Sequence, residues 1–326
     1  MKKKEYNWAV LGCGVIATQL AQAMEQQNRT LYAIGNRTKQ KAIDFAKKYH
    51  ISKVYDNFYE IFTDKEVDVI YITTPHNTHY LFLLEALKHG KHVLCEKSIT
   101  LNETELKEAV ALAKQNDVIL AEAMTIYHMP LYKKLDDIIK NGVLGSLRLV
   151  QMNFGSFKEY NMENRFFNRN LAGGALLDIG VYALSFTRWF FSETPTQILS
   201  QVKFAPTGVD EQACILLMNE KQEMATISLS LHAKQPKRGM VAFENGFIEI
   251  YEYPRADKAV ITYTESGKQE IIKIGKIEKA LEYEIIDMEN SINNIKNDMH
   301  LNYTIDVMHI MTKIRQDWNM KYPEEE

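Results

Sequence analysis

Trp8-Ala9-Val10-Leu11-Gly12-Cys13-Gly14-Val15-Ile16-Ala17 is the stretch that decides the fold. A short apolar run over 8–11 predicts a strand, and apolar residues at helical spacing over 15–26 predict a helix directly after the turn. Gly12 permits a tight turn, Gly14 lets the backbone approach a bound group, and Ala17 lets the helix pack closely on the strand. This GxGxxA pattern is typical of a dinucleotide-binding turn, in which the amides of Val15 and Ile16 face the pyrophosphate. A glycine turn at this place can also be purely structural, so the surrounding pattern has to decide.

The next hundred residues repeat the same alternation of strand and helix. Further strands are predicted over 31–35, 67–73, 92–95 and 118–121, with helices over 40–49, 77–89 and 103–114. Such alternation indicates βαβ units and a parallel sheet. We therefore expect residues 1–123 to form an α/β domain, a doubly wound Rossmann sheet that binds a dinucleotide.

The pattern changes after residue 123. Helices are predicted over 131–140 and 174–191, a strand over 147–154, several β-rich runs between 196 and 274, and closing helices over 277–295 and 303–318. The short β-rich runs, separated by Gly, Pro and Asn, favour an antiparallel sheet. We expect residues 124–326 to form a C-terminal α+β domain with a largely antiparallel open sheet, which binds substrate and mediates oligomerisation. The acidic end from Pro323 to Glu326 is expected to fray.

Composition narrows the class of protein. The 326 residues carry a formal net charge of −3 and no long basic run, which argues against a nucleic-acid partner. No segment approaches the roughly 18 consecutive apolar residues of a membrane span. The three cysteines show neither a disulfide framework nor metal-like spacing, so no metal is expected and a reducing, cytoplasmic location fits.

The end of the second predicted strand bears on the choice of nicotinamide cofactor. NAD sites usually place a carboxylate here to accept from the ribose 2′-hydroxyl, but the sequence is Asn36-Arg37-Thr38. Asn36 and Thr38 are neutral hydrogen-bonding residues, and Arg37 could bind a 2′-phosphate. NADP is therefore the preferred cofactor and NAD the alternative. If Arg37 does not contact the cofactor, it is simply a solvated residue at the start of a helix.

Two further segments suggest chemistry. Glu96-Lys97 follows a buried strand, and the carboxyl ends of parallel strands are where ligands bind in open α/β sheets. In the run from Gly173 to Tyr182, Asp178 and Tyr182 are four residues apart and share a helical face. A phenol normally titrates near pH 10, so it needs a neighbouring cation such as Lys97 to transfer protons near neutrality. The plain alternatives are a solvated Lys97, a capping Asp178 and a packed Tyr182.

The glycine turn, Glu96-Lys97 and the run Ala172–Tyr182, in this order, resemble the Gfo/Idh/MocA family of oxidoreductases over the full chain length. Within the family, Asn36-Arg37-Thr38, Ala121-Glu122-Ala123 and the run 173–182 are most similar to the dimeric dihydrodiol and D-xylose dehydrogenases, which use NADP. The resemblance implies that Lys97 steers the substrate hydroxyl, Tyr182 is the acid/base and Asp178 holds substrate or orients Tyr182. It implies cofactor contacts from Thr73, Thr74, Pro75, Asn77, His79, Glu96, Lys97 and Arg165.

Two departures from the family pattern limit what the resemblance carries. Ser98 stands where the family usually has proline after the lysine, which loosens the turn that fixes Lys97. The stretch Met124–Pro130 lacks the Trp and Arg of the dihydrodiol branch, so substrate identity does not transfer.

The sequence thus predicts hydride transfer between a nicotinamide and a small-molecule sugar, polyol, diol or related carbonyl. It also predicts a homodimer or higher homo-oligomer that covers the open sheet face. The alternatives are a non-catalytic NAD(P)- or ligand-binding sensor on the same fold, and an enzyme of different chemistry on the same scaffold.

Overall fold

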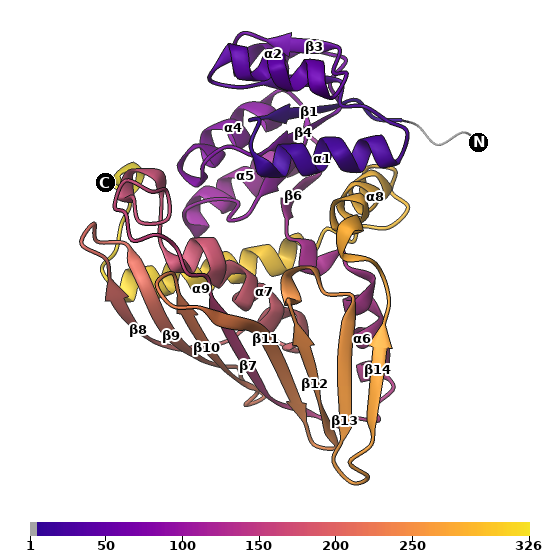
Figure 1. The fold of residues 1–326 in the computed structure, drawn as a ribbon, viewed down its shortest axis with the longest axis vertical. Helices are drawn as coiled ribbons and strands as arrows, with labels where there is room; N and C mark the ends of the chain where they lie inside the picture. The colour runs from indigo at the N-terminus through magenta and orange to yellow at the C-terminus, as the bar shows by residue number, and fades with distance from the viewer. Residues whose placement is uncertain (1–4) are drawn as a thin grey trace. The chain divides into compact units, whose positions relative to one another are not determined.

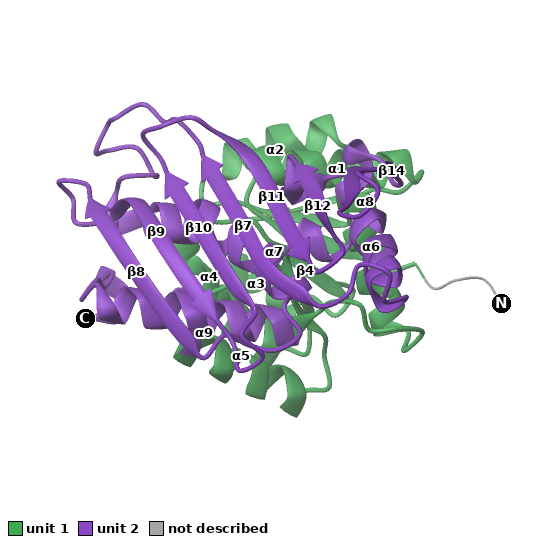
Figure 2. Ribbon diagram, turned by 90° about the horizontal axis from the view of Figure 1, so that it is seen from below, with its two compact units in different colours: residues 1–100, 104–123, 281–301 green, residues 101–103, 124–280, 302–326 purple. Residues whose placement is uncertain are grey.

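The computed structural model describes residues 5–326, which form two units, coloured separately in Figure 2. Unit 1 contains the described residues up to Thr100, together with residues 104–123 and 281–301. Unit 2 contains residues 101–103, 124–280 and 302–326. The chain therefore passes between the units at more places than the single boundary after residue 123, because the segment 281–301 returns to unit 1.

Unit 1 is built on a six-stranded parallel sheet with the order β3-β2-β1-β4-β5-β6. Its elements are β1 (Trp8–Leu11), α1 (Val15–Gln26), β2 (Ala33–Gly35), α2 (Lys39–Lys48), β3 (Lys53–Tyr55), α3 (Phe58–Thr63), β4 (Val69–Ile72), α4 (His76–Lys88), β5 (His92–Glu96), α5 (Glu103–Gln115), β6 (Leu120–Ala123) and α8 (Ala280–Ile292). Every residue of β1 and β4 is buried, as a strand covered on both faces requires. The doubly wound Rossmann sheet is confirmed.

The pattern reading missed β3 and α3. The edge strand Lys53–Tyr55 has three residues and none of them is buried, so it leaves no apolar run in the sequence. α3 is only six residues long, and it begins at Asn57, whose side chain accepts a hydrogen bond from the Glu60 amide at 3.1 Å.

Helix α8 joins unit 1 through polar contacts that cross most of the sequence. The Trp8 indole Nε1 donates to Glu289 Oε1 at 3.1 Å, and Arg29 forms an ion pair with the same oxygen at 2.6 Å. The Tyr6 hydroxyl donates to Asn293 at 2.9 Å. These contacts explain why the segment 281–301 clusters with the N-terminal sheet.

Unit 2 is built on an eight-stranded sheet with the order β14-β13-β12-β11-β7-β10-β9-β8 (Figure 1). Its elements are α6 (Pro130–Lys140), β7 (Leu147–Gly155), α7 (Val181–Phe190), β8 (Gln197–Phe204), β9 (Asp210–Met218), β10 (Met224–Ser230), β11 (Gln235–Phe243), β12 (Gly246–Tyr251), β13 (Lys258–Tyr263), β14 (Gln269–Lys273) and α9 (Leu301–Asp317). All neighbouring strands are antiparallel except β7 and β10, which are parallel. The largely antiparallel C-terminal sheet is confirmed.

The two faces of this sheet differ in cover. Along β9, Ile215 and Leu217 are buried while Leu216 between them is 47% exposed. Figure 2 looks onto the open face of the sheet, with α7 and α9 behind it. Leu199 on β8 and Ile271 on β14 are 67% and 62% exposed on the described surface, so the open sheet carries apolar side chains.

The expectation that the C-terminal end frays is wrong. Pro323–Glu325 form a 3₁₀ turn, and Tyr322 before it is buried. The physical reason is an ion pair between Glu325 and the buried Arg315, which lies in α9. Separately, no helix in residues 5–326 combines the length and apolarity needed to cross a membrane.

Candidate active site

The two glycines of the turn after β1, Gly12 and Gly14, serve different purposes. Gly12 has a φ of +103°, and a Cβ there would lie 2.8 Å from Thr73 Oγ1, so the turn requires glycine. At Gly14, by contrast, no described atom lies within 4 Å of a Cβ position. Val15 is 74% exposed, and no described side chain caps the N-terminus of α1. The turn thus offers open space at Gly14 in front of the N-terminus of α1, which fits a dinucleotide pyrophosphate.

The residues after β2 lie at the surface. Arg37 and Thr38 are exposed, and the Asn36 side-chain amide donates to the Thr38 carbonyl at 3.0 Å. Lys41 in α2, which the sequence reasoning missed, lies close enough to Cys13 to act on its thiol. Burial raises the pKa of Cys13, and the positive charge of Lys41 opposes that rise. A lysine of α2 therefore lies near the glycine turn, in addition to the exposed Arg37 after β2.

The loop after β4 is tied to the turn that carries Lys97. The two ring nitrogens of the fully buried His79 contact the Thr74 carbonyl at 2.8 Å and the Ser98 carbonyl at 2.9 Å. The His76 ring contacts the Lys97 carbonyl at 3.1 Å. The Lys97–Ser98 peptide bond is cis. Two imidazoles thus contact the turn in which serine replaces the expected proline, and only His79 was among the predicted residues.

Two carboxylates hold the chain on either side of Lys97. The Tyr71 hydroxyl, on β4, donates to Glu96 at the end of β5. Beyond Lys97, the Ile99 amide donates at 3.0 Å to Glu122, which is buried in β6. Lys97 itself is partly exposed at the carboxyl end of β5. The role of Glu122 could not be seen in the sequence, because it depends on the pairing of β5 with β6.

Asp178 and Tyr182 lie on one continuous helical segment with a change of pitch. Leu176–Gly180 form a π-helical turn, and α7 begins at Val181. Such turns are rare in proteins, and those that do occur often lie at functional sites. The run from 174 to 191 was predicted to be helical, but nothing in it signals the wider turn.

The side chains of this helical segment lie in a polar and aromatic environment. The Asp178 carboxylate is mostly buried and lies 3.7 Å from the Arg165 guanidinium, which is stacked over the Phe166 ring. The Tyr182 ring packs against Phe154, with ring centroids 6.2 Å apart. Unit 2 therefore brings together three predicted residues: Asp178 and Arg165 in contact, and Tyr182 four positions along the helix.

Tyr253 is a further residue that the sequence did not single out. Burial raises its pKa well above the usual value, and the nearby Tyr182 raises it further. Its hydroxyl has no hydrogen-bond partner within residues 5–326. As for metals, the described residues contain no group of three or more His, Cys, Asp or Glu side chains arranged to hold an ion.

A Rossmann unit with an open glycine turn, joined to a unit with a mostly antiparallel sheet, defines the class of NAD(P)-binding oxidoreductases with a separate second domain. Residues 6–124 match the model of the oxidoreductase family with an NAD-binding Rossmann fold, and residues 132–249 match the C-terminal domain of Gfo/Idh/MocA proteins. The chain belongs to the Gfo/Idh/MocA family.

Relatives in this family are similar over most of the chain. The trans-1,2-dihydrobenzene-1,2-diol dehydrogenase of Homo sapiens is 31% identical over 247 residues, which cover 74% of this chain and 73% of the human protein. The Xenopus tropicalis enzyme is 29% identical, with 74% of each chain covered.

Solved structures show the same fold at lower identity. The 3-ketoreductase KijD10 from Actinomadura kijaniata, in complex with NADP and TDP-benzene, has a TM-score of 0.85 at 18% identity, covering 96% of this chain and 98% of its own. Levoglucosan dehydrogenase, in complex with NADH and levoglucosan, has a TM-score of 0.84 at 15% identity with the same coverage.

Proposed function

We propose that this protein is an NAD(P)-dependent dehydrogenase or reductase acting on a sugar, polyol, diol or related carbonyl, with Lys97 and Tyr182 as the catalytic pair. The observation that carries the proposal is the joint presence of an open, uncapped glycine turn and a held lysine turn at the carboxyl edge of one parallel sheet. The names of the relatives and structural neighbours, a dihydrobenzenediol dehydrogenase, a 3-ketoreductase and a levoglucosan dehydrogenase, support the substrate class.

The proposed cofactor is NADP, with NAD as the alternative. Gly12, Gly14, Val15 and Ile16 would hold the pyrophosphate, and Asn36, Arg37 and Thr38 the adenosine ribose. Thr73, Thr74, Pro75, Asn77, His79, Glu96, Lys97 and Arg165 remain proposed cofactor contacts. Arg37 is exposed after β2 without an acidic neighbour at 36 or 38, and Lys41 adds positive charge near the turn. This charge favours a 2′-phosphate.

Each residue of the proposed pair has one task. The bound nicotinamide supplies or accepts the hydride. In the oxidative direction, Tyr182 accepts the proton of the substrate hydroxyl while the carbon of that hydroxyl loses its hydride. In the reductive direction, Tyr182 donates a proton to the carbonyl oxygen. Lys97 stabilises the negative charge that develops on this oxygen. Asp178 holds the substrate or orients Tyr182.

The competing function is a non-catalytic sensor that binds NAD(P) and reports to a partner. A sensor requires the glycine turn but has no use for a positioned lysine or for an acid/base tyrosine. The two contacts that hold the backbone at Lys97, from His76 and His79, therefore favour the enzyme.

The test combines binding with turnover. NADPH and NADH are titrated by fluorescence against the wild type and against Arg37→Ala and Lys41→Ala. Turnover is then measured on aldoses, inositols, diols and dicarbonyls with Lys97→Ala and Tyr182→Phe alongside. We expect both of the latter variants to lose about 10²–10⁴-fold in kcat. Tyr182→Phe should bind NADPH as the wild type does, whereas Lys97→Ala should bind it more weakly, because Lys97 is also a proposed cofactor contact. Cofactor binding without turnover on any compound would favour the sensor, and equal turnover by Tyr182→Phe would remove the assigned acid/base.

We also propose that the protein is a homodimer through the open face of the unit 2 sheet. The support is a set of exposed apolar residues, Leu199, Leu216 and Met224, on the neighbouring strands β8, β9 and β10. Light scattering after size exclusion should give twice the subunit mass, and Leu216→Lys should reduce it to one. A single subunit mass for the wild type at micromolar concentration would refute the dimer.

A further inference from the structure

We propose that Asp210 and Tyr322, which belong to none of the predicted motifs, are positioning residues that fix the start of the helical segment carrying Asp178 and Tyr182. The inference rests on the proposed function, because it gives these two residues a part in placing the acid/base group. All the contacts that support it lie within unit 2.

The helical segment begins at the pair Gly173-Gly174, whose backbone is hydrogen-bonded and closely packed. Gly174 has a φ of +123°, in the region that favours glycine. Its amide donates to the Phe166 carbonyl at 2.9 Å, and the Gly173 amide donates to the Asn168 carbonyl at 3.0 Å. A Cβ at Gly173 would lie 2.7 Å from the Arg165 carbonyl oxygen. The backbone of the pair is therefore packed against the loop that carries Arg165.

Asp210 closes the other side of this turn. Its Oδ2 accepts a hydrogen bond of 2.6 Å from the Leu176 amide, the first residue of the π-helical turn. A Cβ at Gly174 would lie 2.1 Å from Asp210 Oδ1, so the carboxylate fills the space that glycine leaves. The Asp210 carboxylate therefore does what an N-cap side chain does, but from the first residue of β9. No local sequence pattern can show such a cap.

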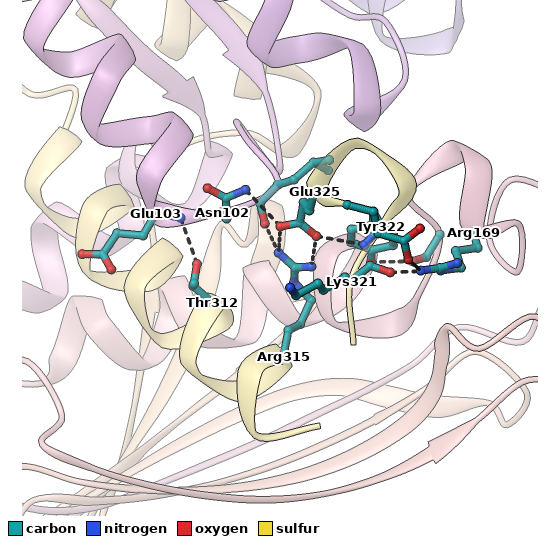
Figure 3. A network of polar contacts seen from close by, with 11 residues as sticks. Asn102, Glu103, Arg169, Thr312, Arg315, Lys321, Tyr322 and Glu325 are labelled. Carbon is teal, nitrogen blue, oxygen red and sulfur yellow. Dashed lines mark hydrogen bonds and ion pairs between the residues drawn. The ribbon is translucent and has the colours of Figure 1, made fainter. Parts of the chain in front are cut away.

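Tyr322 holds the same turn from the C-terminal end of the chain. Its buried hydroxyl donates to the Gly173 carbonyl at 2.7 Å. Its ring lies under the Arg315 guanidinium, at 4.8 Å from the ring centroid. Arg315 forms a two-point ion pair with Glu325 at 2.6 and 2.8 Å, and Glu325 also accepts from the Asn102 side chain and the Tyr322 amide, both at 2.9 Å (Figure 3).

A second set of contacts, from Arg169, holds the last residues of the chain. Arg169 donates to the Lys321 carbonyl at 2.9 Å and forms an ion pair with Glu326, as Figure 3 shows for the Lys321 contact. Arg169 lies in the loop just before the glycine pair. The C-terminal segment 321–326 thus bears on the turn both directly, through Tyr322, and through the neighbouring loop.

The free-energy cost of burying the Asp210 carboxylate distinguishes a positioning role for this residue from a role in stabilising the fold. Asp210 is fully buried, and the loss of solvation raises the pKa of its carboxyl to about 7 in spite of the amide hydrogen bonds and the charge of Arg315. No residue within 5–326 hydrogen-bonds to its Oδ1. A carboxylate held in this way disfavours the folded state when ionised. Residues that weaken the fold but fix local geometry are expected at functional sites.

The test uses Tyr322→Phe and Asp210→Asn, with Tyr263→Phe as the matched control. Tyr263, like Tyr322, donates its hydroxyl to one acceptor, but this acceptor is the Glu270 carboxylate at 2.9 Å, on the exposed β13–β14 hairpin. Deuterium exchange of the peptide covering 173–182 and kcat and KM for NADPH and substrate are measured for each. Asp210→Ala is added, since Asn retains an acceptor for the Leu176 amide and Ala does not.

We expect Tyr322→Phe and Asp210→Ala to exchange about fivefold faster in 173–182, the factor that corresponds to one net hydrogen bond. We expect kcat to fall about tenfold with KM for NADPH unchanged, and Asp210→Asn to recover part of the loss. Unchanged exchange in both variants, or a fall in NADPH affinity equal to the fall in kcat, would overturn the inference. A wild type that binds NADPH without turnover would refute the proposed function, while the exchange data would still decide whether the two residues fix the turn.

Discussion

Replacing Asp210 with asparagine gives a stability change whose pH dependence can be worked out from the structure. The Asp210 carboxyl is fully buried. Two ionisable side chains interact electrostatically with it, Arg315 and Tyr322. Burial raises its pKa from 3.8 in the unfolded chain to about 7 in the folded protein. The folded state therefore binds the proton more tightly than the unfolded state does, and stability falls as pH rises between these two values.

The size of the effect follows from the shift. About three pKa units at about 1.4 kcal/mol each correspond to roughly 4 kcal/mol, fully present above about pH 7 and absent below about pH 4. At pH 5 about 2 kcal/mol of this cost is already expressed. Asparagine cannot ionise, so Asp210→Asn removes the pH-dependent part. Any constant difference between the amide and the protonated carboxyl cancels when two pH values are compared.

Urea unfolding of the wild type and of Asp210→Asn at pH 5 and pH 8 measures this directly. We expect the free energy of unfolding of the variant, relative to the wild type, to be about 2–3 kcal/mol higher at pH 8 than at pH 5. A difference between the two proteins that is the same at both pH values would show that the pKa of Asp210 is not raised. A difference that grows toward low pH would show that the pKa is lowered, and would contradict the energetic argument for positioning.

Three other predictions test the local account. Gly14→Ala should leave the midpoint of thermal unfolding nearly unchanged and weaken NADPH binding, whereas Gly12→Ala, at φ +103° and 2.8 Å from Thr73 Oγ1, should destabilise the fold by about 1–3 kcal/mol; equal effects in both assays would argue against a cofactor site at Gly14. Burial would raise the pKa of Glu325, but the hydrogen bonds and charge of Arg315, together with hydrogen bonds from the Tyr322 amide and Asn102, outweigh it and hold the pKa below the usual value. The ion pair therefore stabilises the folded state above the ordinary glutamate pKa, and this stabilisation is lost as the pH falls. Glu325→Gln should lower the free energy of unfolding by about 3 kcal/mol at pH 7 and by much less at pH 3. A loss of the same size at both pH values would contradict this assignment. His79→Leu removes the ring contacts to the Thr74 and Ser98 carbonyls and should lower kcat more than it raises KM for substrate; an unchanged kcat would separate His79 from the Lys97 turn.

The fold could be predicted well from the sequence where burial leaves a periodic pattern. The apolar runs of β1 and β4 and the glycine turn indicated a parallel Rossmann sheet because each strand there is covered on both faces. The short edge strand Lys53–Tyr55 and the six-residue α3 were missed because neither carries enough apolar residues to form a pattern. The return of α8 to unit 1 depends on Glu289 meeting Trp8 and Arg29, a pairing across some 260–280 positions that no local reading contains.

The candidate site divides in the same way. Lys97, Asp178 and Tyr182 were predicted from their motifs, and their roles stay predictions; the structure places Lys97 just after the end of a strand and the other two on one helical segment. The side chains that hold them, Glu122 and Asp210, come from neighbouring strands and give no signal of their own. The C-terminal segment was expected to fray because acidic, proline-containing ends usually do, and only the buried Arg315 shows why this one does not.

Hydride transfer itself can be followed with NADPH that carries deuterium at both positions of nicotinamide C4, a panel of ketosugars and dicarbonyls, and Tyr182→Phe as the comparison. We expect the reduced product to gain one deuterium on the carbon that was the carbonyl. We expect Tyr182→Phe to form this product far more slowly while binding NADPH as tightly as the wild type. Tight binding of NADPH with no deuterium in any product would contradict the account and leave the sensor as the better description.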